Sequence, residues 1–565
     1  MNLLEIRQLS VGFGQDPTSD ALHGVELTIP LGGTTGLVGE SGSGKTLTAY
    51  SILKLLDPAA CIRGGRILYH GSGAPKDLLL MPEREMRSIR GQQISIVFQE
   101  AMSALNPVLK CGFQVEEVIR AHRRAGTREM EELVLDTLRR VGLEDPRRVY
   151  RSYPFELSGG QVQRVLIAQA IILSPKLVIA DEPTTALDVR TQQKIMELFQ
   201  QINQELGCSI LFISHDLALV RTLCSEVAVM KNGAIVEQGS TTQVFSHPQH
   251  PYTRGLLHCR PPLYQKVSKL QTLGDFGENV DGLIHTVPRL ITTEELLERR
   301  NLLTNSETLL EVEGLDVYYK KSGQSWFAAS PGLHAVKGVS FSIREGEALG
   351  LVGESGSGKS SIGRSIVQLI RAQKGSIRFK GEQLNGPRGR MKYFRKEIQM
   401  VFQDPFSSLN PRQRIGRAIV EPMEIHRLYG SDAERHEHAC ELLRIVGLEP
   451  DHFNRYPHQF SGGQRQRICI ARALAVGPRL LICDEAVSAL DISVQAQVLN
   501  LLKELQSLYG LSYLFISHDL SVVHFIADQI IVLKDGAIVE TGSSEELVQS
   551  PQNPYTRALL EAAPK

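Results

Sequence analysis

The sequence predicts an α/β protein that contains the same domain twice. Its 565 residues exceed the usual length of one domain, and an apolar content of 42% is enough to fill ordinary cores. Several long segments occur in two copies: Ser158 and Ser461 lie 303 residues apart, as do His215 and His518. In both copies, unbroken apolar runs alternate with helical patterns. This alternation is typical of central strands in a sheet that is covered on both faces.

The repeats divide the chain into two copies and a connection. The copies begin with LLEIRQLSV and LLEVEGLDV, so we place them at 1–258 and 308–565, with a connection at 259–307 that extends the first copy. The connection contains several Pro and Gly residues, followed by ITTEELLERRNLL. This stretch predicts a short helix that is N-capped by Thr292 or Thr293.

The predicted elements follow the same order in each copy. An apolar strand, TTGLVG or EALGLVG, enters a glycine-rich turn. After Gln99 and Gln403, few β-rich runs occur as far as about residues 157 and 460, which indicates a helical insertion. The apolar runs KLVIAD and RLLICD then end in a carboxylate, and CSILFIS and LSYLFIS end just before a histidine. We expect all of these runs to be central strands.

Composition excludes several classes of protein. Lys plus Arg and Asp plus Glu both number 62, and this zero net charge argues against a broad nucleic-acid footprint. No apolar run reaches the roughly 18 residues of a membrane span, and the first residues do not resemble a signal peptide. None of the eight cysteines forms a Cys-x-x-Cys pair. We therefore expect a reduced, cytosolic protein with interior thiols and no zinc ribbon.

Each copy carries one phosphate-binding pattern. Segments Gly39–Thr46 and Gly353–Ser360 both fit G-x-x-x-x-G-K-[ST]. Glycines let successive backbone N–H groups turn toward phosphate oxygens, and the following helix adds the positive end of its dipole. The lysine is expected to reach the β- and γ-phosphates, and the Thr or Ser hydroxyl to reach Mg²⁺. Two matches, each preceded by a strand, make a chance glycine-rich turn a poor explanation.

Further polar residues follow the apolar strands. Asp181-Glu182 and Asp484-Glu485 can hold Mg²⁺ through the Asp and polarise a water through the Glu. An isolated Asp-Glu pair is more often a solvated turn, but a phosphate loop in the same copy favours the catalytic interpretation. His215 or Gln99 alone would more often be a structural or surface residue. Their roles depend on the remaining pattern.

Together with LSGGQ at Leu157–Gln161 and FSGGQ at Phe460–Gln464, these motifs resemble the ATP-binding-cassette (ABC) ATPases over nearly the whole chain. The resemblance implies two ABC-ATPase nucleotide-binding domains. Each has a phosphate-loop core, a helical subdomain and a small antiparallel β subdomain. It also implies a head-to-tail sandwich, in which each ATP lies between the phosphate loop of one copy and the SGGQ of the other. SGGQ is expected to open a helix whose N–H groups face a γ-phosphate.

The resemblance assigns residues to two ATP sites. The first contains Gly39, Ser41, Gly42, Gly44, Lys45, Thr46, Gln99, Asp181, Glu182 and His215, completed by Ser461, Gly463 and Gln464. The second contains Gly353, Ser355, Gly356, Gly358, Lys359, Ser360, Gln403, Asp484, Glu485 and His518, completed by Ser158, Gly160 and Gln161.

Within these two sites, the resemblance gives further roles. The expected Mg²⁺ ligands are Thr46, Gln99 and Asp181 in one site and Ser360, Gln403 and Asp484 in the other. Phe13 and Tyr319 match an aromatic residue that stacks on adenine, with Tyr318 adjacent and a plain core aromatic as the alternative. Asp188 and Asp491 match the loop that links the sites. Both sites are expected to be competent.

The segments PYTRGLL and PYTRALL resemble the C-terminal ends of ATPases that power dipeptide, oligopeptide and nickel importers. This resemblance implies two separate integral-membrane permease subunits, a solute-binding protein that acts through them, and a peripheral position on the cytoplasmic face of the inner (plasma) membrane. Some relatives carry a cysteine-rich cluster motif after this segment. Because only Cys259 lies there, we expect no iron–sulfur cluster.

Two other classes of protein remain as alternatives. A soluble tandem ABC protein that acts on ribosomes or nucleic acid would need a charged arm or a basic surface, and the mixed connection supplies neither. A purely regulatory nucleotide sensor conflicts with the presence of Glu182 and Glu485. The nature of the cargo, from a peptide to chelated nickel, is not encoded by these motifs.

Overall fold

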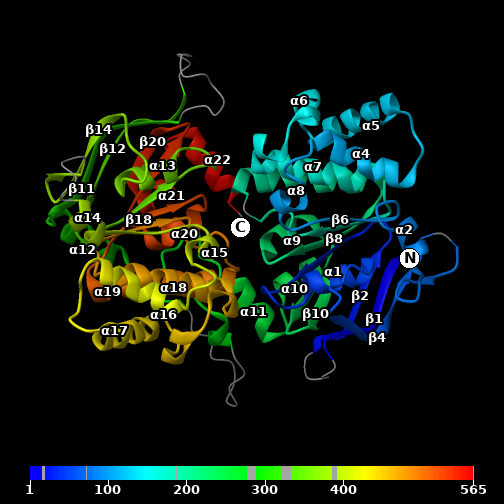
Figure 1. Cartoon of the computed structure of the whole chain (residues 1–565), viewed down its shortest axis with the longest axis horizontal. Helices are drawn as coiled ribbons and strands as arrows, with labels where there is room; N and C mark the ends of the chain where they lie inside the picture. Colours follow the sequence, from blue (N-terminus) through cyan, green and yellow to red (C-terminus); the bar gives the residue numbers. More distant parts are fainter. Residues whose placement is uncertain are drawn as a thin grey trace.

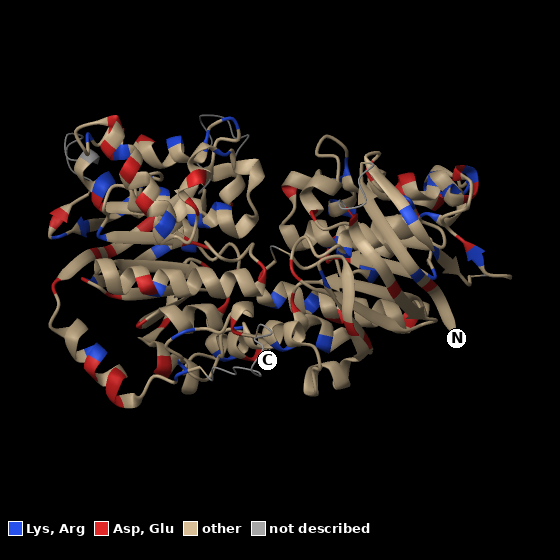
Figure 2. Ribbon diagram, turned by 90° about the horizontal axis from the view of Figure 1, so that it is seen from below, with Lys and Arg blue, Asp and Glu red and all other residues tan. Residues whose placement is uncertain are grey.

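The chain folds into two lobes that follow the two sequence copies (Figure 1). The structure is a computed structural model that describes residues 1–14, 20–71, 73–185, 187–276, 288–319, 332–384 and 391–563. Lobe 1 comprises the elements from β1 to α11, and lobe 2 comprises those from β11 to α22. Lys and Arg are interspersed with Asp and Glu over both lobes (Figure 2).

Lobe 1 contains two sheets. The antiparallel sheet has the order β2-β1-β4-β5 and comprises β1 (Asn2–Phe13), β2 (Asp20–Pro30), β4 (Ala60–Tyr69) and β5 (Lys76–Asp77). The six-stranded sheet has the order β10-β9-β3-β8-β7-β6 and comprises β3 (Thr34–Val38), β6 (Ile94–Val97), β7 (Leu177–Asp181), β8 (Ser209–Ser214), β9 (Glu226–Lys231) and β10 (Ala234–Ser240). All pairs in this sheet are parallel except β9 with β10.

Helices complete lobe 1. The core helices are α1 (Lys45–Leu53), α2 (Glu83–Ile89), α8 (Val189–Leu206), α9 (Leu217–Leu223), α10 (Thr241–Ser246) and α11 (Pro251–His258). Between β6 and β7 the chain forms α3 (Ala101–Ala104), α4 (Cys111–His122), α5 (Thr127–Arg140), α6 (Pro146–Arg151) and α7 (Gly159–Ile171). The predicted helical insertion is therefore confirmed. Its helices bury apolar side chains such as Val115, Leu138 and Val165 in one shared core.

Lobe 2 repeats this architecture. Its antiparallel sheet, ordered β12-β11-β14-β15, comprises β11 (Thr308–Tyr319), β12 (Leu333–Arg344), β14 (Lys374–Phe379) and β15 (Glu382–Gln383). Its six-stranded sheet, ordered β16-β17-β18-β13-β19-β20, comprises β13 (Ala348–Val352), β16 (Ile398–Val401), β17 (Leu480–Asp484), β18 (Ser512–Ser517), β19 (Gln529–Lys534) and β20 (Ala537–Ser543). Its helices are α13 (Lys359–Ile366), α14 (Met391–Glu397), α15 (Pro405–Ser408), α16 (Ile415–Ile425), α17 (Asp432–Ile445), α18 (Gly462–Leu474), α19 (Ile492–Tyr509), α20 (Leu520–Ile526), α21 (Ser544–Gln549) and α22 (Pro554–Ala562).

The strand order brings the predicted motifs to one edge of each sheet. In lobe 1, β3 lies beside β8, and β8 lies beside β7 in parallel register. Their carboxyl ends lead to the glycine-rich loop, to His215 and to Asp181-Glu182, respectively. Ligands of open α/β sheets bind at this edge. The unbroken apolar runs are buried along their whole length, as expected for central strands.

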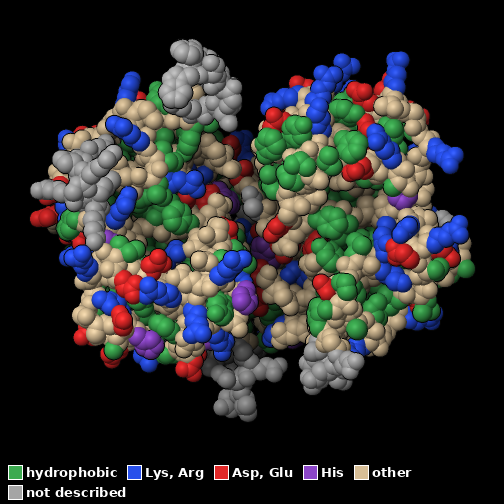
Figure 3. Space-filling view, in the orientation of Figure 1, with side chains coloured by type: hydrophobic (Ala, Val, Ile, Leu, Met, Phe, Trp, Pro, Cys, Tyr) green, Lys and Arg blue, Asp and Glu red, His purple; other side chains and the backbone are tan. Residues whose placement is uncertain are grey.

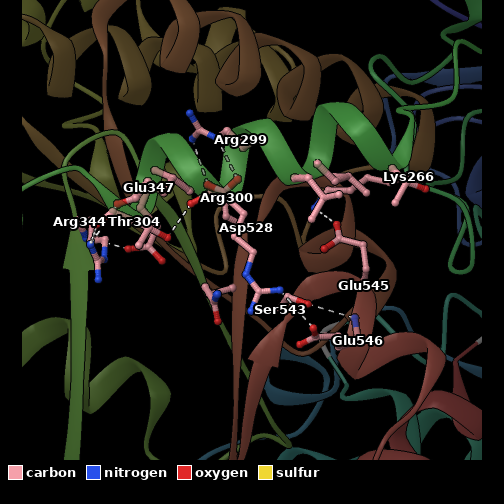
Figure 4. A pocket seen from close by; sticks show the side chains of 15 residues that line it. Lys266, Arg299, Arg300, Thr304, Arg344, Glu347, Asp528, Ser543, Glu545 and Glu546 are labelled. Atoms are coloured by element: carbon pink, nitrogen blue, oxygen red, sulfur yellow. Dashed lines mark hydrogen bonds and ion pairs between the residues drawn. The ribbon is translucent and has the colours of Figure 1, made fainter.

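The connection between the lobes packs against lobe 2. The predicted helix is confirmed as α12 (Thr293–Thr304), and Thr292 and Glu295 form its N-terminal capping box. Figure 4 shows Arg299 of α12 directed toward Asp528, to which its Nε donates over 3.1 Å. Val267 and Leu270 belong to the hydrophobic core of lobe 2, so this segment is fixed by burial as well as by charge.

The expectation that all thiols are interior is wrong for Cys61. This residue lies in β4, where the strand extends beyond the covered part of the antiparallel sheet, and it is exposed. The other seven cysteines are buried, including Cys469 and Cys483. Burial raises the pKa of the Cys483 thiol to about 12, which keeps it protonated and unreactive near neutral pH.

Candidate functional site

Both glycine-rich loops form closed backbone turns before a helix. In lobe 1, Gly44 caps α1 with a φ of 104°, in the left-handed region. A Cβ atom on Gly39 would lie 2.2 Å from the carbonyl oxygen of Met230, so only glycine fits there. Lys45 Nζ donates to the carbonyl oxygens of Gly39 and Glu40, both over 2.8 Å. The lysine is therefore held inside its own loop.

Lobe 2 repeats the same loop geometry. Lys359 Nζ donates over 2.7 Å to the carbonyl oxygen of Gly353 and over 2.8 Å to that of Glu354. Burial lowers the pKa of both lysines, against the attraction of the neighbouring carboxylates. A buried ammonium group whose partners are only carbonyl oxygens can exchange them for the stronger charge of a phosphate.

The hydroxyl after each lysine contacts the strand-end aspartate. Thr46 Oγ1 donates to Asp181 Oδ1 over 3.2 Å, and Ser360 Oγ donates to Asp484 Oδ1 over 2.7 Å. Asp181 Oδ2 is buried without a hydrogen-bond partner among the described residues. Burial raises the pKa of Asp181 to about 6. A buried carboxylate oxygen without a partner, next to a hydroxyl, is a donor set that suits Mg²⁺.

Glu182 is the most highly connected residue of the first site. Its Oε2 accepts hydrogen bonds from Gln99 Nε2 over 3.1 Å and from Thr185 Oγ1 over 3.0 Å, and it lies 3.1 Å from His215 Nδ1. Desolvation alone would raise the pKa of Glu182, but the hydrogen bond and charge of His215 outweigh it and lower this pKa. Desolvation alone would lower the pKa of His215, but the same contact raises it. The pair is therefore held as carboxylate and imidazolium.

Glu485 has the corresponding place in the second site, with a more distant histidine. It accepts a hydrogen bond from Gln403 Nε2 over 2.8 Å, but His518 Nδ1 lies 3.6 Å away. Ser488, the counterpart of Thr185, donates to the backbone oxygen of Glu485 and not to its carboxylate. Burial alone would raise the pKa of Glu485, and His518 reverses the direction and lowers it.

Both glutamates share a strained backbone. The φ angles are 46° at Glu182 and 48° at Glu485, in the left-handed region that is costly for residues other than glycine. Such strain persists only where the surrounding structure enforces it. Its recurrence at the same residue of both lobes indicates a functional position.

Each phosphate loop contacts the other lobe. Ser41 N–H donates to Asp491 Oδ2 over 2.8 Å, and Arg190 donates to Glu354 Oε1 over 2.6 Å. Asp491 Oδ1 also lies 3.9 Å from His215 Nδ1. The lobes therefore meet head to tail: the phosphate loop of each lobe contacts the residues at the start of α8 or α19 in the other lobe. The space-filling view shows the lobes separated by a furrow on one face (Figure 3).

The SGGQ segments open helices, as predicted. Ser158 caps α7 in a capping box with Gln161, and Ser461 caps α18 in the same way with Gln464. Among the described residues, these two serines make hydrogen bonds within their own lobe only. The structure thus does not join them directly to the opposite phosphate loop.

The SGGQ glycines nevertheless pack beside the segments that contact the opposite loop. A Cβ atom on Gly160 would lie 2.7 Å from Thr191 Cγ2, and one on Gly463 would lie 2.0 Å from Val494 Cγ1. Thr191 adjoins Arg190, which contacts the phosphate loop of lobe 2. The signature segment and the opposite loop are therefore linked through the first turn of α8 or α19.

The two expected adenine-stacking residues lie at strand ends. Tyr319 is 37% exposed at the end of β11, and its hydroxyl lies 3.0 Å from Ser361 Oγ, next to the phosphate loop. Phe13 is 42% exposed at the end of β1. Tyr318 instead stacks on His334, with the ring centroids 4.0 Å apart. The geometry favours Tyr319 over its neighbour.

Sequence reasoning missed two residues of these sites. Thr185 binds Glu182, and Arg364 lies with its Nε 3.9 Å from Asp484 Oδ2. In lobe 1 the position of Arg364 is held by Tyr50. The difference between Thr185 and Ser488 was readable from the aligned copies, but its effect on hydrogen bonding was not.

This fold and this arrangement of loop, aspartate, glutamate and histidine define a tandem P-loop nucleoside triphosphatase. The profile of the ABC transporter family matches residues 22–185 and 336–488, more than half of the chain. The profile of the oligopeptide/dipeptide transporter C-terminal region matches residues 236–284 and 539–565. The chain therefore belongs to the ABC transporter family, as an ATP-hydrolysing subunit with two fused ATPase domains.

Full-length relatives share this organisation. The chain is 41% identical over 571 residues to the glutathione import ATP-binding protein GsiA of Pectobacterium atrosepticum, covering 100% of this chain and 89% of the relative. It is 43% identical over 575 residues to the peptidoglycan transport ATP-binding protein YejF of Agrobacterium fabrum, covering 99% and 96%. A solved ATP-binding cassette bound to ADP and phosphate is 30% identical, covers 42% of this chain and 99% of that one, and has a TM-score of 0.38.

No helix within the described part of the chain is long and apolar enough to cross a membrane. The expected absence of an iron–sulfur cluster stays a prediction.

Proposed function

We propose that the two loop regions are two competent ATP sites that drive import of peptide-like solutes. The observation that carries this proposal is the position of Glu182 and Glu485. Each lies at the carboxyl end of a central strand, bound to a glutamine, and each has a phosphate loop in its own lobe that contacts the other lobe.

The residues of each site have separate tasks in this proposal. Lys45 and Lys359 turn from their loop carbonyls to the phosphates. Glu182 and Glu485 accept a proton from the attacking water, and Gln99 and Gln403 orient that water. Mg²⁺ would be held by Thr46, Gln99 and Asp181 in one site and by Ser360, Gln403 and Asp484 in the other, where it would neutralise phosphate charge. On closure, the SGGQ residues of the opposite lobe complete each site.

The transport role is supported by the relatives and by the C-terminal region. The names of the two relatives specify glutathione import and peptidoglycan transport, so we assign this chain to the import of peptide-like cargo. The subunit would lie peripherally on the cytoplasmic face of the inner membrane, bound to two permease subunits that receive cargo from a solute-binding protein. The comparisons do not support the alternative of a soluble protein acting on ribosomes or nucleic acid.

The variants Glu182→Gln and Glu485→Gln test the two sites. A general base contributes about 10²- to 10⁴-fold to its step. If the sites were independent, each variant would keep about half of the turnover. Because Asp491 contacts both Ser41 and His215, we expect coupled sites and a loss of at least tenfold in steady-state ATPase. The exposed Glu205→Gln is the matched control, and near-normal turnover in either site variant would refute the proposal.

Affinity purification from membranes tests the transport role. Recovery of two integral-membrane subunits with the chain supports import. Recovery of ribosomal RNA without membrane subunits would support the alternative.

A further inference from the structure

The tyrosines of the two PYTR segments reach the phosphate loops. Glu40 N–H donates to the Tyr252 hydroxyl oxygen over 3.0 Å, and Glu354 N–H donates to that of Tyr555 over 3.1 Å. Both tyrosines are buried, with exposed fractions of 4% and 7%. Each contact joins residues more than 200 positions apart and involves the same loop position in both lobes, so it is a repeated tertiary contact and not a local turn.

The surroundings of the two tyrosines are also repeated. Lys231 Nζ lies 5.1 Å from the ring centroid of Tyr252, and Lys534 Nζ lies 5.0 Å from that of Tyr555. Burial is the main cause that raises the pKa of both hydroxyls, to about 12 at Tyr555, so both stay protonated. Each hydroxyl therefore both accepts from the loop and keeps a proton to donate. Tyr252 donates it to Glu40 Oε2 over 3.4 Å.

The glutamate that each tyrosine holds also contacts the opposite lobe. Ser493, at the start of α19, donates to Glu40 Oε1, and Arg190, at the start of α8, donates to Glu354 Oε1. The helix that each tyrosine begins packs on the same opposite element. Helix α11 contacts α19, and α22 contacts α8 at the junction of the lobes (Figure 1). The phosphate loop, the helix that begins with PYTR and the first turn of the opposite helix thus contact one another pairwise.

The loop has a reason to need such support. Lys45 Nζ binds the carbonyl oxygens of Gly39 and Glu40, and both are released when the lysine turns to a phosphate. The start of the loop then loses its internal partner at the moment of binding. A hydroxyl that holds the Glu40 N–H keeps this residue, and its contact with Ser493, in place during the exchange.

We propose that Tyr252 and Tyr555 are positioning residues, and that through them the C-terminal region of each lobe couples its phosphate loop to the opposite lobe. This inference rests on the proposed ATP sites. It gives the C-terminal region a task within the ATPase itself, besides any contact with other subunits.

The first test removes one hydroxyl at one site. Tyr252→Phe is made in a Lys359→Ala background, which isolates the first site, and binding of a fluorescent ATP analogue is measured by anisotropy. We expect the apparent Kd to rise about 2- to 10-fold, the value of one hydrogen bond. The KM for ATP should rise with little change in kcat, because the hydroxyl does not touch the reacting atoms.

The matched control is Tyr513→Phe in the same background. The Tyr513 hydroxyl is also buried and donates to the carbonyl oxygen of Leu502 over 2.7 Å, within the core of lobe 2. The variant Tyr513→Phe should reduce the melting temperature as much as Tyr252→Phe does and leave the Kd for the ATP analogue unchanged. An equal Kd for Tyr252→Phe and its parent would overturn the role of the tyrosine but would leave the proposed ATP site intact. A parent that binds no nucleotide would remove the proposed site and the inference with it.

A double-mutant cycle tests the coupling across the lobes. Tyr252→Phe and Ser493→Ala act on the same glutamate, so their effects on ATP-driven closure should be non-additive by more than about twofold. Tyr252→Phe and Arg190→Ala act on different loops and should be additive. Closure is followed by energy transfer between dyes on the two lobes. Additive behaviour in the first pair would show that the tyrosine has no effect beyond its own loop and would overturn the coupling.

Discussion

Asn500→Ala should weaken the docking of the connection on lobe 2 without unfolding that lobe. Asn500 lies in α19 and is buried, and it binds the backbone of Leu270 twice. Leu270 N–H donates to its Oδ1 and its Nδ2 donates to the Leu270 carbonyl oxygen, both over 2.9 Å. The side-chain amide of Asn500 thus satisfies both the N–H and the carbonyl of Leu270, as a neighbouring strand would.

The two contacts set the size of the effect. Each buried backbone group left without a partner costs about 1–3 kcal/mol. Leu270 would lose both partners in the docked state but would regain water when undocked. The free energy of docking should therefore fall by about 2–6 kcal/mol, which corresponds to at least a roughly 30-fold increase in the undocked population.

Amide hydrogen exchange measures this undocking at positions that do not contact Asn500. Ser268 N–H donates to Arg289 and Ile291 N–H donates to Lys266, both over 2.9 Å within the connection. Their exchange should accelerate by at least about 30-fold in Asn500→Ala. The exposed Glu197 holds the same position in lobe 1, and Glu197→Ala should leave these rates unchanged. Unaltered protection of Ser268 and Ile291 in Asn500→Ala would refute the reasoning.

Three further predictions concern packing, acid stability and thiol reactivity. Gly463→Ala would place a methyl group 2.0 Å from Val494 and should cost about 1–3 kcal/mol in thermal unfolding, so an unchanged melting temperature would contradict this packing. Desolvation lowers the pKa of buried His524 to about 4, so keeping this residue neutral contributes its full stability above its ordinary pKa near 6.5. At pH 5 the free energy of unfolding should be about 2 kcal/mol lower on this account. His524→Gln should remove this part of the acid loss, and an identical pH profile in the variant would contradict the assignment. A maleimide reagent should modify Cys61 rapidly and Cys483 only after unfolding, and equal native rates would be inconsistent with their burial.

The sequence was sufficient to predict the features that depend on local chemistry. The glycine-rich loops, the helix that SGGQ opens, the helix capped near Thr292 and the buried central strands each follow from residues near one another in the chain. The pairing of Asn500 with Leu270 joins residues 230 positions apart, and no local pattern marks either one. The exposure of Cys61 was missed for the same reason, because it depends on which part of the antiparallel sheet other elements cover.

Fusion of the two domains explains why the two sites can differ. In a homodimer, any substitution appears in both sites at once, whereas a tandem chain changes one site alone. Asp188 caps α8 through Thr191, but its counterpart Asp491 leaves α19 uncapped and binds the Ser41 N–H of the opposite loop. The same motif thus stabilises a helix in one lobe and the interface in the other.

The residues around Glu182 and Glu485 diverge in the same way. Thr185 donates a hydrogen bond to Glu182 and His215 lies 3.1 Å from it, whereas Ser488 does not bind the Glu485 carboxylate and His518 lies 3.6 Å away. Asp484 faces Arg364, whereas Asp181 faces no arginine among its described ion pairs. The motifs themselves are intact in both lobes. The two proposed sites therefore differ in their supporting residues and not by loss of a motif, so we expect their hydrolysis rates to differ.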